Sequence, residues 1–291
     1  CVLPPSADGK FTFVRDCEAT TIDKYGILKT IPANILRSKW RNGKSADLIE
    51  PQSANKFKYS NNFTFWSSVV AGTGTAPVVT PNFAISPDGT KNASRIVFDA
   101  GSNGESTLRR GDVTGLGTTN TISVFIKSNT QSSQTLHFQV NGTTGGEIIA
   151  TTEWQRIDYT AVQSSELWGL QLLTPTSPDQ TVDVLVAFIQ AEPNSYATSY
   201  IHNETSELNI RLKDELKNVG TTDCFNSLEG VLIIEAAALS DDLSYRTIMI
   251  SDGTANNSLQ MYFRPTSNSM TFIYQSAGVS VFNQTLTLPD I

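Results

Sequence analysis

The sequence predicts an all-β protein, in which a jelly-roll β-sandwich is followed by a second, shorter β-sandwich. Short stretches in which apolar and polar residues alternate occur along most of the chain, as expected for strands with one buried face. The 291 residues include 19 Gly and 12 Pro, which gather with Ser, Thr and Asn between these stretches and mark turns. A hydrophobic content of 39% without a sustained helical period fits many short strands joined by polar turns.

Residues 1–49 lack such a period, and we expect them to form an extended N-terminal arm or anchor with two short strands, at 11–14 and 25–28. Residues 1–58 carry 10 basic and 6 acidic side chains, whereas the remainder carries 11 and 22, so the arm is basic and the body acidic. The arm could dock onto an acidic neighbour or extend into solvent. The acidic body disfavours nucleic acid as a partner, because phosphates require a basic face.

Residues 50–201 are predicted to form the jelly roll, with roughly eight strands and no convincing helix between them. Aromatic side chains concentrated between Phe57 and Trp66 provide enough apolar area to nucleate its core. The clearest alternation occurs at 121–127, where Phe125 points outward or toward a second layer, and at 136–140. The last strand begins at Thr181 and ends before Pro193, since proline cannot donate to a strand ladder.

The turns between these strands have recognisable chemistry. At 86–90 proline presets φ, Asp88 caps the turn and Gly89 accepts a positive φ. Asn141-Gly142 and Gly145-Gly146 predict two further reversals.

Residues 202–220 are predicted to be a polar connector, and residues 221–291 a second, partial β-sandwich. Leu208, Leu212 and Leu216 recur at a spacing of four and indicate a short amphipathic helix in the connector. Five strands are expected in the second sandwich, at 231–236, 245–251, 259–263, 270–274 and 280–288. The first residue, Cys1, follows no leader and the strand pattern is still in progress at Ile291, so we expect both ends to be internal to a longer chain.

Short landmarks spread along nearly the whole chain resemble one known family. They are Phe11-Thr12-Phe13-Val14-Arg15 with Ala19-Thr20 and Tyr25-Gly26; Leu48-Ile49-Glu50-Pro51-Gln52; Tyr59-Ser60-Asn61-Asn62-Phe63 with Trp66; Ser86-Pro87-Asp88-Gly89-Thr90; Ala197-Thr198-Ser199-Tyr200-Ile201; and Glu229-Gly230-Val231 with Ile250-Ser251-Asp252-Gly253-Thr254. In this order they resemble tailed-bacteriophage virion appendage proteins, the tail-fibre, head-fibre and spike-like subunits.

The resemblance implies a carbohydrate-binding-module-like jelly roll followed by a partial laminin-G or concanavalin A-like sandwich. It further implies a virion structural protein, made in the cytoplasm of a host bacterium and assembled as a homotrimer with other virion proteins. Two departures from the family pattern are His202-Asn203, where a proline and a small residue are usual, and the end of the second sandwich at Ile291.

No catalytic residue is predicted. Glucanases with the concanavalin A-like fold carry alternating acidic residues on one strand, but the matching stretch at 229–235 has aliphatic residues in those places. The only two histidines, His137 and His202, have no nucleophile motif beside them and are expected to be exposed polar residues. The cysteines Cys1, Cys17 and Cys224 lack metal-ligand spacing, and we expect isolated thiols. No cofactor is predicted, apart from a structural calcium ion.

Glycan binding commonly uses an aromatic side chain, because the apolar face of a sugar ring packs on it. We predict such a platform at Trp168, Tyr159 and Trp66, with Trp154 as a further candidate and core packing as the alternative for each. Asp88 and Asp252, both in turns, are the candidate calcium ligands, with turn capping as the alternative.

The sequence therefore predicts a non-enzymatic fibre or spike subunit that presents β-sandwiches for attachment to a host-surface glycan or for virion assembly. The alternatives are a glycan-binding accessory module of a secreted adhesin and the same module of a polysaccharide depolymerase. No apolar run approaches the roughly 20 residues that cross a bilayer, so membrane insertion is not expected.

Overall fold

A computed structural model describes residues 12–41, 43–162, 166–217 and 234–289. The chain divides into two compact units, Cys1–Glu229 and Gly230–Ile291. No helix in the described part of the chain is long and apolar enough to cross a membrane.

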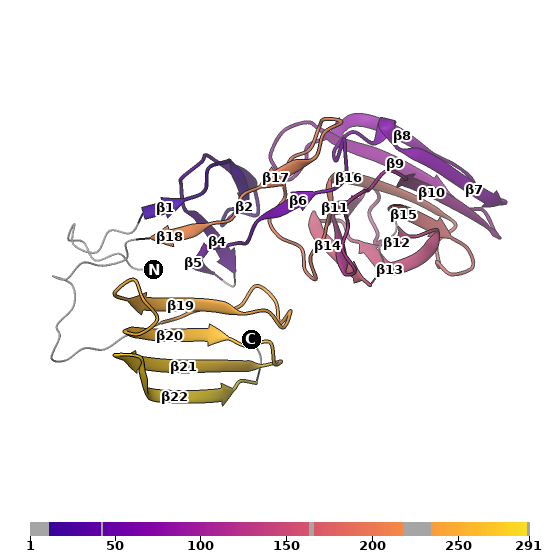
Figure 1. Cartoon of the computed structure of the whole chain (residues 1–291). Coiled ribbons are helices and arrows are strands. Elements are labelled where there is room, and N and C mark those ends of the chain that lie inside the picture. Colours follow the sequence, from indigo (N-terminus) through magenta and orange to yellow (C-terminus); the bar gives the residue numbers. More distant parts are fainter. Residues whose placement is uncertain (1–11, 42, 163–165, 218–233, 290–291) are drawn as a thin grey trace. The chain divides into compact units, whose positions relative to one another are not determined.

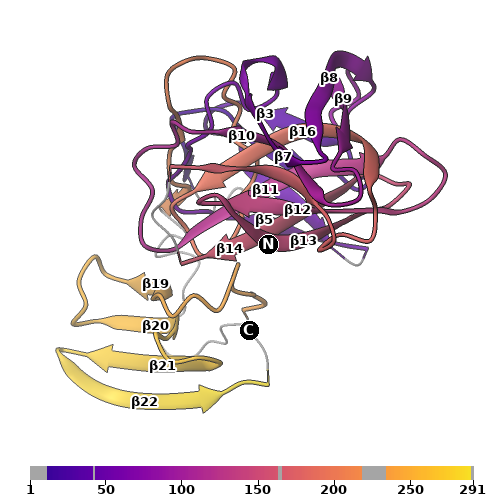
Figure 2. The same ribbon diagram turned by 90° about the vertical axis from the view of Figure 1, so that its right-hand side faces the viewer.

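The first unit contains a β-sandwich of two five-stranded antiparallel sheets (Figures 1 and 2). The first sheet has the order β13 (Thr143–Ala150), β12 (Gln134–Val140), β15 (Trp168–Leu173), β10 (Gly104–Arg110) and β7 (Ser67–Gly72). The second has the order β14 (Gln155–Ala161), β11 (Asn120–Ser128), β16 (Thr181–Glu192), β9 (Ala93–Asp99) and β8 (Thr75–Ala84). The chain crosses repeatedly between the two sheets, so the predicted all-β jelly-roll sandwich is confirmed.

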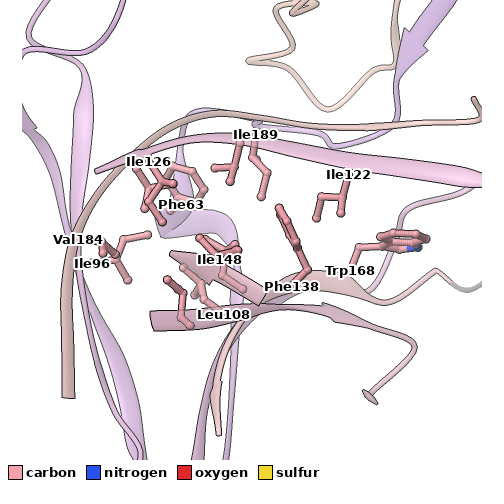
Figure 3. Close-up of a cluster of buried hydrophobic side chains, with 14 of the residues drawn as sticks. Phe63, Ile96, Leu108, Ile122, Ile126, Phe138, Ile148, Trp168, Val184 and Ile189 are labelled. Carbon is pink, nitrogen blue, oxygen red and sulfur yellow. The ribbon is translucent and has the colours of Figure 1, made fainter. Parts of the chain in front are cut away.

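The core lies between the two sheets because each strand alternates inward apolar and outward polar residues (Figure 3). Strand β11 contributes Ile122, Val124 and Ile126, as its alternation predicted. The predicted aromatic nucleus contributes Phe57, which is fully buried, and also Phe63 at the start of the 3-10 helix η1 (Phe63–Phe65). Ten strands close this core, which is close to the number that the sequence indicated.

The second sheet is also covered on its outer face. Phe125 of β11, Phe188 of β16 and Tyr200 form a small apolar cluster there with Leu28 and Ala93. The N-terminal hairpin therefore packs against the sandwich, and Phe125 faces a second layer as expected.

The N-terminal residues of the described chain form short strands instead of a continuous extended segment. The strands are β1 (Thr12–Val14), β2 (Ala19–Ile22), β3 (Leu28–Ile31), β4 (Arg37–Arg41), β5 (Lys44–Leu48) and β6 (Ser53–Asn55). Strands β2 and β3 pair with each other, as do β4 and β5. Strand β1 pairs with β18 (Glu215–Lys217) and β6 with β17 (Asn209–Arg211), so the segments before and after the sandwich lie side by side (Figure 1).

A buried ion-pair network joins these segments. Asp214, between β17 and β18, lies 3.2 Å from Arg15 and 2.5 Å from Arg37. Glu50 lies 2.8 Å from Arg37 and 3.6 Å from Arg211. All five side chains are at most 4% exposed, so three positive and two negative charges are held together out of water.

The helix predicted in the connector is not formed. Strands β17 and β18 occupy this segment, and Leu208, Leu212 and Leu216 are each more than a third exposed. Since no surface buries them together, their spacing of four does not produce a helix. The boundary predicted at 220/221 lies outside the described residues, as do Cys1 and Cys224, while Cys17 is a free thiol.

The described part of the second unit is one four-stranded antiparallel sheet. Its strands are β19 (Arg246–Ser251), β20 (Ser258–Phe263), β21 (Ser269–Ser276) and β22 (Val279–Thr287), in that order. They confirm four of the five strands predicted here. The fifth, expected at 231–236, lies outside the described residues up to 233 and is not a strand at 234–236.

Candidate functional site

The three aromatic residues predicted to stack on a sugar lie inside or against the core. Trp168 is 0% exposed and lies at one end of the core cluster (Figure 3), and Trp66 is 7% exposed. The burial of Trp168 and Trp66 corrects the expected platform, because a buried ring offers no face to a ligand. Tyr159 is partly buried and its ring is engaged with Phe138, on which it stacks with the ring centroids 6.2 Å apart.

Tyr159 explains the Gly145-Gly146 pair, which was expected to form a reversal. Both glycines lie within β13, and a Cβ at Gly146 would sit 2.4 Å from Cδ2 of Tyr159. The pair therefore makes room for the tyrosine ring. The neighbouring Asn141-Gly142 turn is confirmed, with positive φ at both residues.

Trp154, the further aromatic candidate, is also committed to packing. Its indole Nε1 donates to the Ile85 carbonyl at 3.2 Å, and its ring packs against the apolar cluster on the outer face of the second sheet. It therefore helps to close that face instead of presenting a free platform.

Asp88 and Asp252, the candidate calcium ligands, each cap their own turn. The carboxylate of Asp88 accepts hydrogen bonds from Ser86 Oγ, Thr90 N and Asn92 Nδ2, and that of Asp252 from Thr254 N and Asn257 Nδ2. Burial raises the pKa of Asp88, but these hydrogen bonds outweigh it and hold the pKa below its usual value. In the part of the chain that the structure describes, no three His, Cys, Asp or Glu side chains gather in a group that could hold a metal ion.

Polar side chains gather on the outward face of the first sheet, here called the polar face. They alternate along each strand with residues of the core, so the same periodicity that builds the core also builds this surface. The polar face consists of Thr144 and Glu147 on β13, Thr135, His137 and Gln139 on β12, Gly169 and Gln171 on β15, and Glu105, Thr107 and Arg109 on β10.

Strand register arranges these residues in rows across the sheet. Glu147, His137, Gln171 and Thr107 are successive cross-strand partners. The next row consists of Thr144, Gln139, Gly169 and Arg109, and the register of the β12–β13 pair shifts between the two rows. Side chains from four strands are therefore brought together although their residues are distant in the sequence.

One part of the polar face is a hydrogen-bond network centred on Gln171. Its Nε2 donates to Glu105 at 2.9 Å, and its Oε1 accepts from Thr144 Oγ1 at 2.9 Å. Thr107 Oγ1 also donates to Glu105, at 2.7 Å. Since Gln171 and Thr107 are buried, they fix the position of the partly exposed Glu105 carboxylate.

Arg109 crosses Gly169 to reach Gln139. In the amide orientation that satisfies both groups, the Gln139 oxygen accepts from Arg109 Nη1 at 3.3 Å and from Gly142 N at 2.9 Å. A Cβ at Gly169 would lie 2.7 Å from both Cα and Cβ of Arg109. The glycine thus lets the two strands and the arginine side chain approach closely.

His137 is buried in the centre of the polar face, not exposed as predicted. Its Nδ1 atom has no hydrogen-bond partner in the described chain, and burial lowers the pKa of the imidazole although Glu147 opposes this. The ring is therefore neutral near pH 7 and can serve as a hydrogen-bond donor or acceptor.

Phe65 provides an exposed aromatic surface near the first sheet, which the candidate residues Trp66, Trp154 and Trp168 do not. It is 55% exposed and stacks on Tyr59 with the ring centroids 4.3 Å apart. Arg110 Nη1 donates to the Phe65 carbonyl, and its guanidinium lies 5.9 Å from the Tyr59 ring centroid. Both residues precede β7, which is an edge strand of the first sheet.

The polar face was not among the predicted sites, although its residues follow a pattern in the sequence. In GESTLRR, QTLHFQV and WGLQLL every position that alternates with the core, except Leu173, carries Glu, Thr, Arg, His, Gln or Gly. Charged and amide residues of this size on neighbouring strands indicate a surface with a ligand or a partner. Only the strand order, which is non-local, brings them together.

No family model matches the chain, and no curated protein matches it. Among solved structures, the chain is similar to carbohydrate-binding β-sandwich modules.

One of these is a Clostridium thermocellum endo-1,4-β-D-xylanase fragment with CBM22-1 and GH10 modules, complexed with xylohexaose. The identity is 15% and the TM-score 0.33, over 53% of this chain but only 30% of that chain. For the xylan-binding CBM22-1 domain of a Paenibacillus barcinonensis xylanase, the identity is 16% and the TM-score 0.31, over 50% of this chain and 94% of that chain. For a family 11 carbohydrate-binding module from Clostridium thermocellum, the identity is 13% and the TM-score 0.27, over 58% of this chain and 96% of that chain. Likeness at this level does not transfer a function or a site to this chain.

Proposed function

We propose that the protein is a non-enzymatic glycan-binding protein and that its polar face contacts the glycan. The observation that carries the proposal is the row arrangement of carboxylate, amide, guanidinium and imidazole groups on one sheet face. Planar groups of these kinds match the paired hydroxyls of sugars. A carboxylate accepts two hydrogen bonds at fixed spacing and a guanidinium donates two, whereas an amide or a neutral imidazole can both donate and accept.

The accessibility of the groups supports this role. Arg109 and Glu105 are partly exposed and Glu147 is exposed, so a ligand can reach them. Gln139, Gln171 and other buried groups hold these residues in position, as a preorganised binding surface requires. Phe65, at the β7 side of the same sheet, offers a ring for the apolar face of a sugar.

Binding of the purified protein to a glycan array tests the proposal. Arg109→Ala should weaken binding to the recognised glycan by about tenfold or more, since it removes a charged hydrogen-bond donor from the surface. The matched control is Lys39→Ala, which removes the same charge from the exposed residue 39 of β4. An array without any bound glycan, or an equal effect of both variants, would exclude the polar face as the glycan site.

We further propose that this binding serves a bacteriophage appendage: a homotrimeric fibre or spike subunit located in the virion. The support is the order of landmarks along the sequence, from Phe11-Thr12-Phe13-Val14 to Ile250-Ser251-Asp252. Its partners would be other virion proteins, further copies of the chain and a glycan of the host surface.

Two measurements separate this role from the alternatives. Light scattering gives the mass of three chains for a trimeric fibre subunit and of one chain for an accessory module. Antibodies against the protein should label purified phage particles, whereas an adhesin module would label the producing cell. Loss of capsular polysaccharide turbidity in the presence of the protein would instead indicate a depolymerase.

A further inference from the structure

A cavity lies beside the second sheet, near β8 and the bulge of β16. It has a volume of about 430 Å³ and is here called the amide cleft. Its lining includes Asn61, Asn82, Asn92, Phe188, His202 and Glu204. None of these residues belongs to the polar face, so the cleft is a separate site.

The backbone of two lining residues is held in an unusual conformation. Phe188 has a φ of 54° and Asn82 a φ of 52°, in the left-handed region that a bulky residue such as phenylalanine rarely adopts. The register between β11 and β16 shifts between Ser123 and Phe125, opposite Phe188. A β-bulge therefore redirects the phenylalanine out of the regular ladder.

The bulge is fixed by the loop on the other side of the cleft. The backbone N–H of Phe188 donates to Asn61 Oδ1 at 3.0 Å, and that of Ile189 donates to the Ser60 carbonyl at 3.1 Å. The Phe188 ring packs against Tyr200 and His202, with centroid distances of 4.9 and 6.0 Å. The floor of the cleft is thus rigid before any ligand binds. Such backbone outliers occur preferentially at ligand sites.

The charge in the cleft is negative and uncompensated. Glu204 forms no ion pair within the described residues, and burial raises the pKa of its carboxyl although the Asn61 backbone N–H opposes this. Burial lowers the pKa of His202, against the charges of Glu18 and Asp88, so its ring is neutral near pH 7. The cleft lining contains no Lys or Arg either, so no lining residue balances the charge of Glu204.

One hydrogen-bond acceptor of the lining is also left without a donor. Asn92 Oδ1 is buried and has no partner in the described chain. The Asn92 Nδ2 group, in contrast, is already used by Asp88. A ligand that supplies several donors and a positive charge would complement both Glu204 and this unpaired amide oxygen.

We propose that the amide cleft binds the protonated amino group of an amino sugar. An ammonium group has three donors and no acceptor, and its charge pairs with Glu204 at the mouth of the cleft. The choice of a sugar as the carrier of the amine rests on the proposed glycan-binding function. The amine preference itself rests only on the cleft.

Calorimetric titration of the full chain with a glucosamine tetramer and an N-acetylglucosamine tetramer tests the proposal. Acetylation removes the positive charge but keeps the sugar ring, so the wild-type protein should bind the glucosamine tetramer about tenfold more tightly. Glu204→Gln should abolish this preference while leaving the thermal unfolding midpoint unchanged. The control Glu207→Gln, at an exposed residue outside the cleft lining, should retain it.

Equal binding of the two tetramers to the wild-type protein, or a preference that survives Glu204→Gln, would overturn the amine site. The Arg109→Ala variant separates this result from the proposed function. If Arg109→Ala leaves every glycan interaction intact while Glu204→Gln removes the amine preference, the polar-face proposal fails and the cleft assignment stands. If Arg109→Ala weakens glycan binding but Glu204→Gln leaves the amine preference intact, the polar-face proposal stands and the cleft assignment fails.

Discussion

Asp214 is the residue on which the buried ion-pair network depends most. Its carboxylate forms ion pairs with both Arg15 and Arg37, and its backbone N–H donates to the Glu50 carbonyl at 2.9 Å. Removing one partner of a buried ion pair leaves an uncompensated charge out of water, which is far more costly than loss of an exposed pair.

Asp214→Ala should therefore lower the free energy of unfolding of the first unit by about 3–5 kcal/mol. Urea denaturation, followed by tryptophan fluorescence, measures the change. The exposed Asp158→Ala is the control and should stay within about 0.5 kcal/mol of the wild-type value. A small effect at Asp214 would mean that water enters the network.

Glu50 gives the network a dependence on pH. Burial raises the pKa of its carboxyl, but the charges of Arg211 and Arg37 and two hydrogen bonds from Ser199 outweigh this and hold the pKa below its usual value of 4.5. A carboxyl whose pKa is lowered by folding stabilises the fold above its unfolded pKa. That contribution is lost as the pH falls through the folded value.

Glu50→Gln should be less stable than the wild-type protein at about pH 7, and the difference should shrink progressively below about pH 4.5. Thermal unfolding followed by circular dichroism across this range checks the expectation. Glu153→Gln, at an exposed residue after β13, is the matched control. A difference that stays constant with pH would show that Glu50 acts by packing alone.

At the level of elements, alternation predicted the strands of the sandwich well because each has one face in the core. The same alternation places Trp168 beside Leu170 and Leu172, and could have assigned it to the core. Strands β17 and β18 could not be predicted, since each has only three residues and forms by pairing with β6 and β1, more than 150 residues away.

Part of the candidate site was predictable and part was not. The polar residues of β10, β12 and β15 are visible as the non-core positions of each strand. Their meeting in rows depends on the sheet order, and the position of Phe188 depends on a bulge that has no local sequence signal.

The approach of β10 to β15 depends on Gly169. A Cβ there would lie 2.2 Å from the Leu108 carbonyl oxygen and 2.7 Å from Arg109 Cα, both backbone atoms that cannot turn away. Gly169→Ala should therefore force the two strands apart, lowering the free energy of unfolding by about 1–3 kcal/mol and weakening glycan binding.

Denaturation and glycan titration of the same variant check this expectation. Gly117→Ala, where the nearest atoms lie 3.8 Å or more from the added Cβ, is the control and should be close to neutral. Full stability of Gly169→Ala would mean that the sheet has room which the strand register does not indicate.

At the scale of the whole first unit, the N-terminal strands and the sandwich form one folded body. The hairpin β2–β3 contributes Leu28 to the cluster around Phe188, and the ion-pair network connects β4 with the residues that follow the sandwich. The segment predicted as an arm is therefore held by apolar packing and by buried charge.

Hydrogen exchange should show the amides of β2 and β4 opening with the same free energy as those of β11 in the wild-type protein. In Asp214→Ala the N-terminal amides should exchange faster than those of β11, because the network no longer couples the two parts. Faster exchange of β2 and β4 already in the wild-type protein would mean that the N-terminal strands open independently.

The pairing of β1 with β18 determines how the first unit would respond to mechanical tension. Thr12 lies opposite Lys217 and Val14 opposite Glu215, so the outer ends of both strands are at the same side of the pair. Force applied to the outer ends of these two strands would break the backbone hydrogen bonds of the pair one after another. The ion pairs of Asp214 with Arg15 and Arg37 would bear the force next. The ten-stranded sandwich lies outside that load path and would remain intact while the paired ends yield.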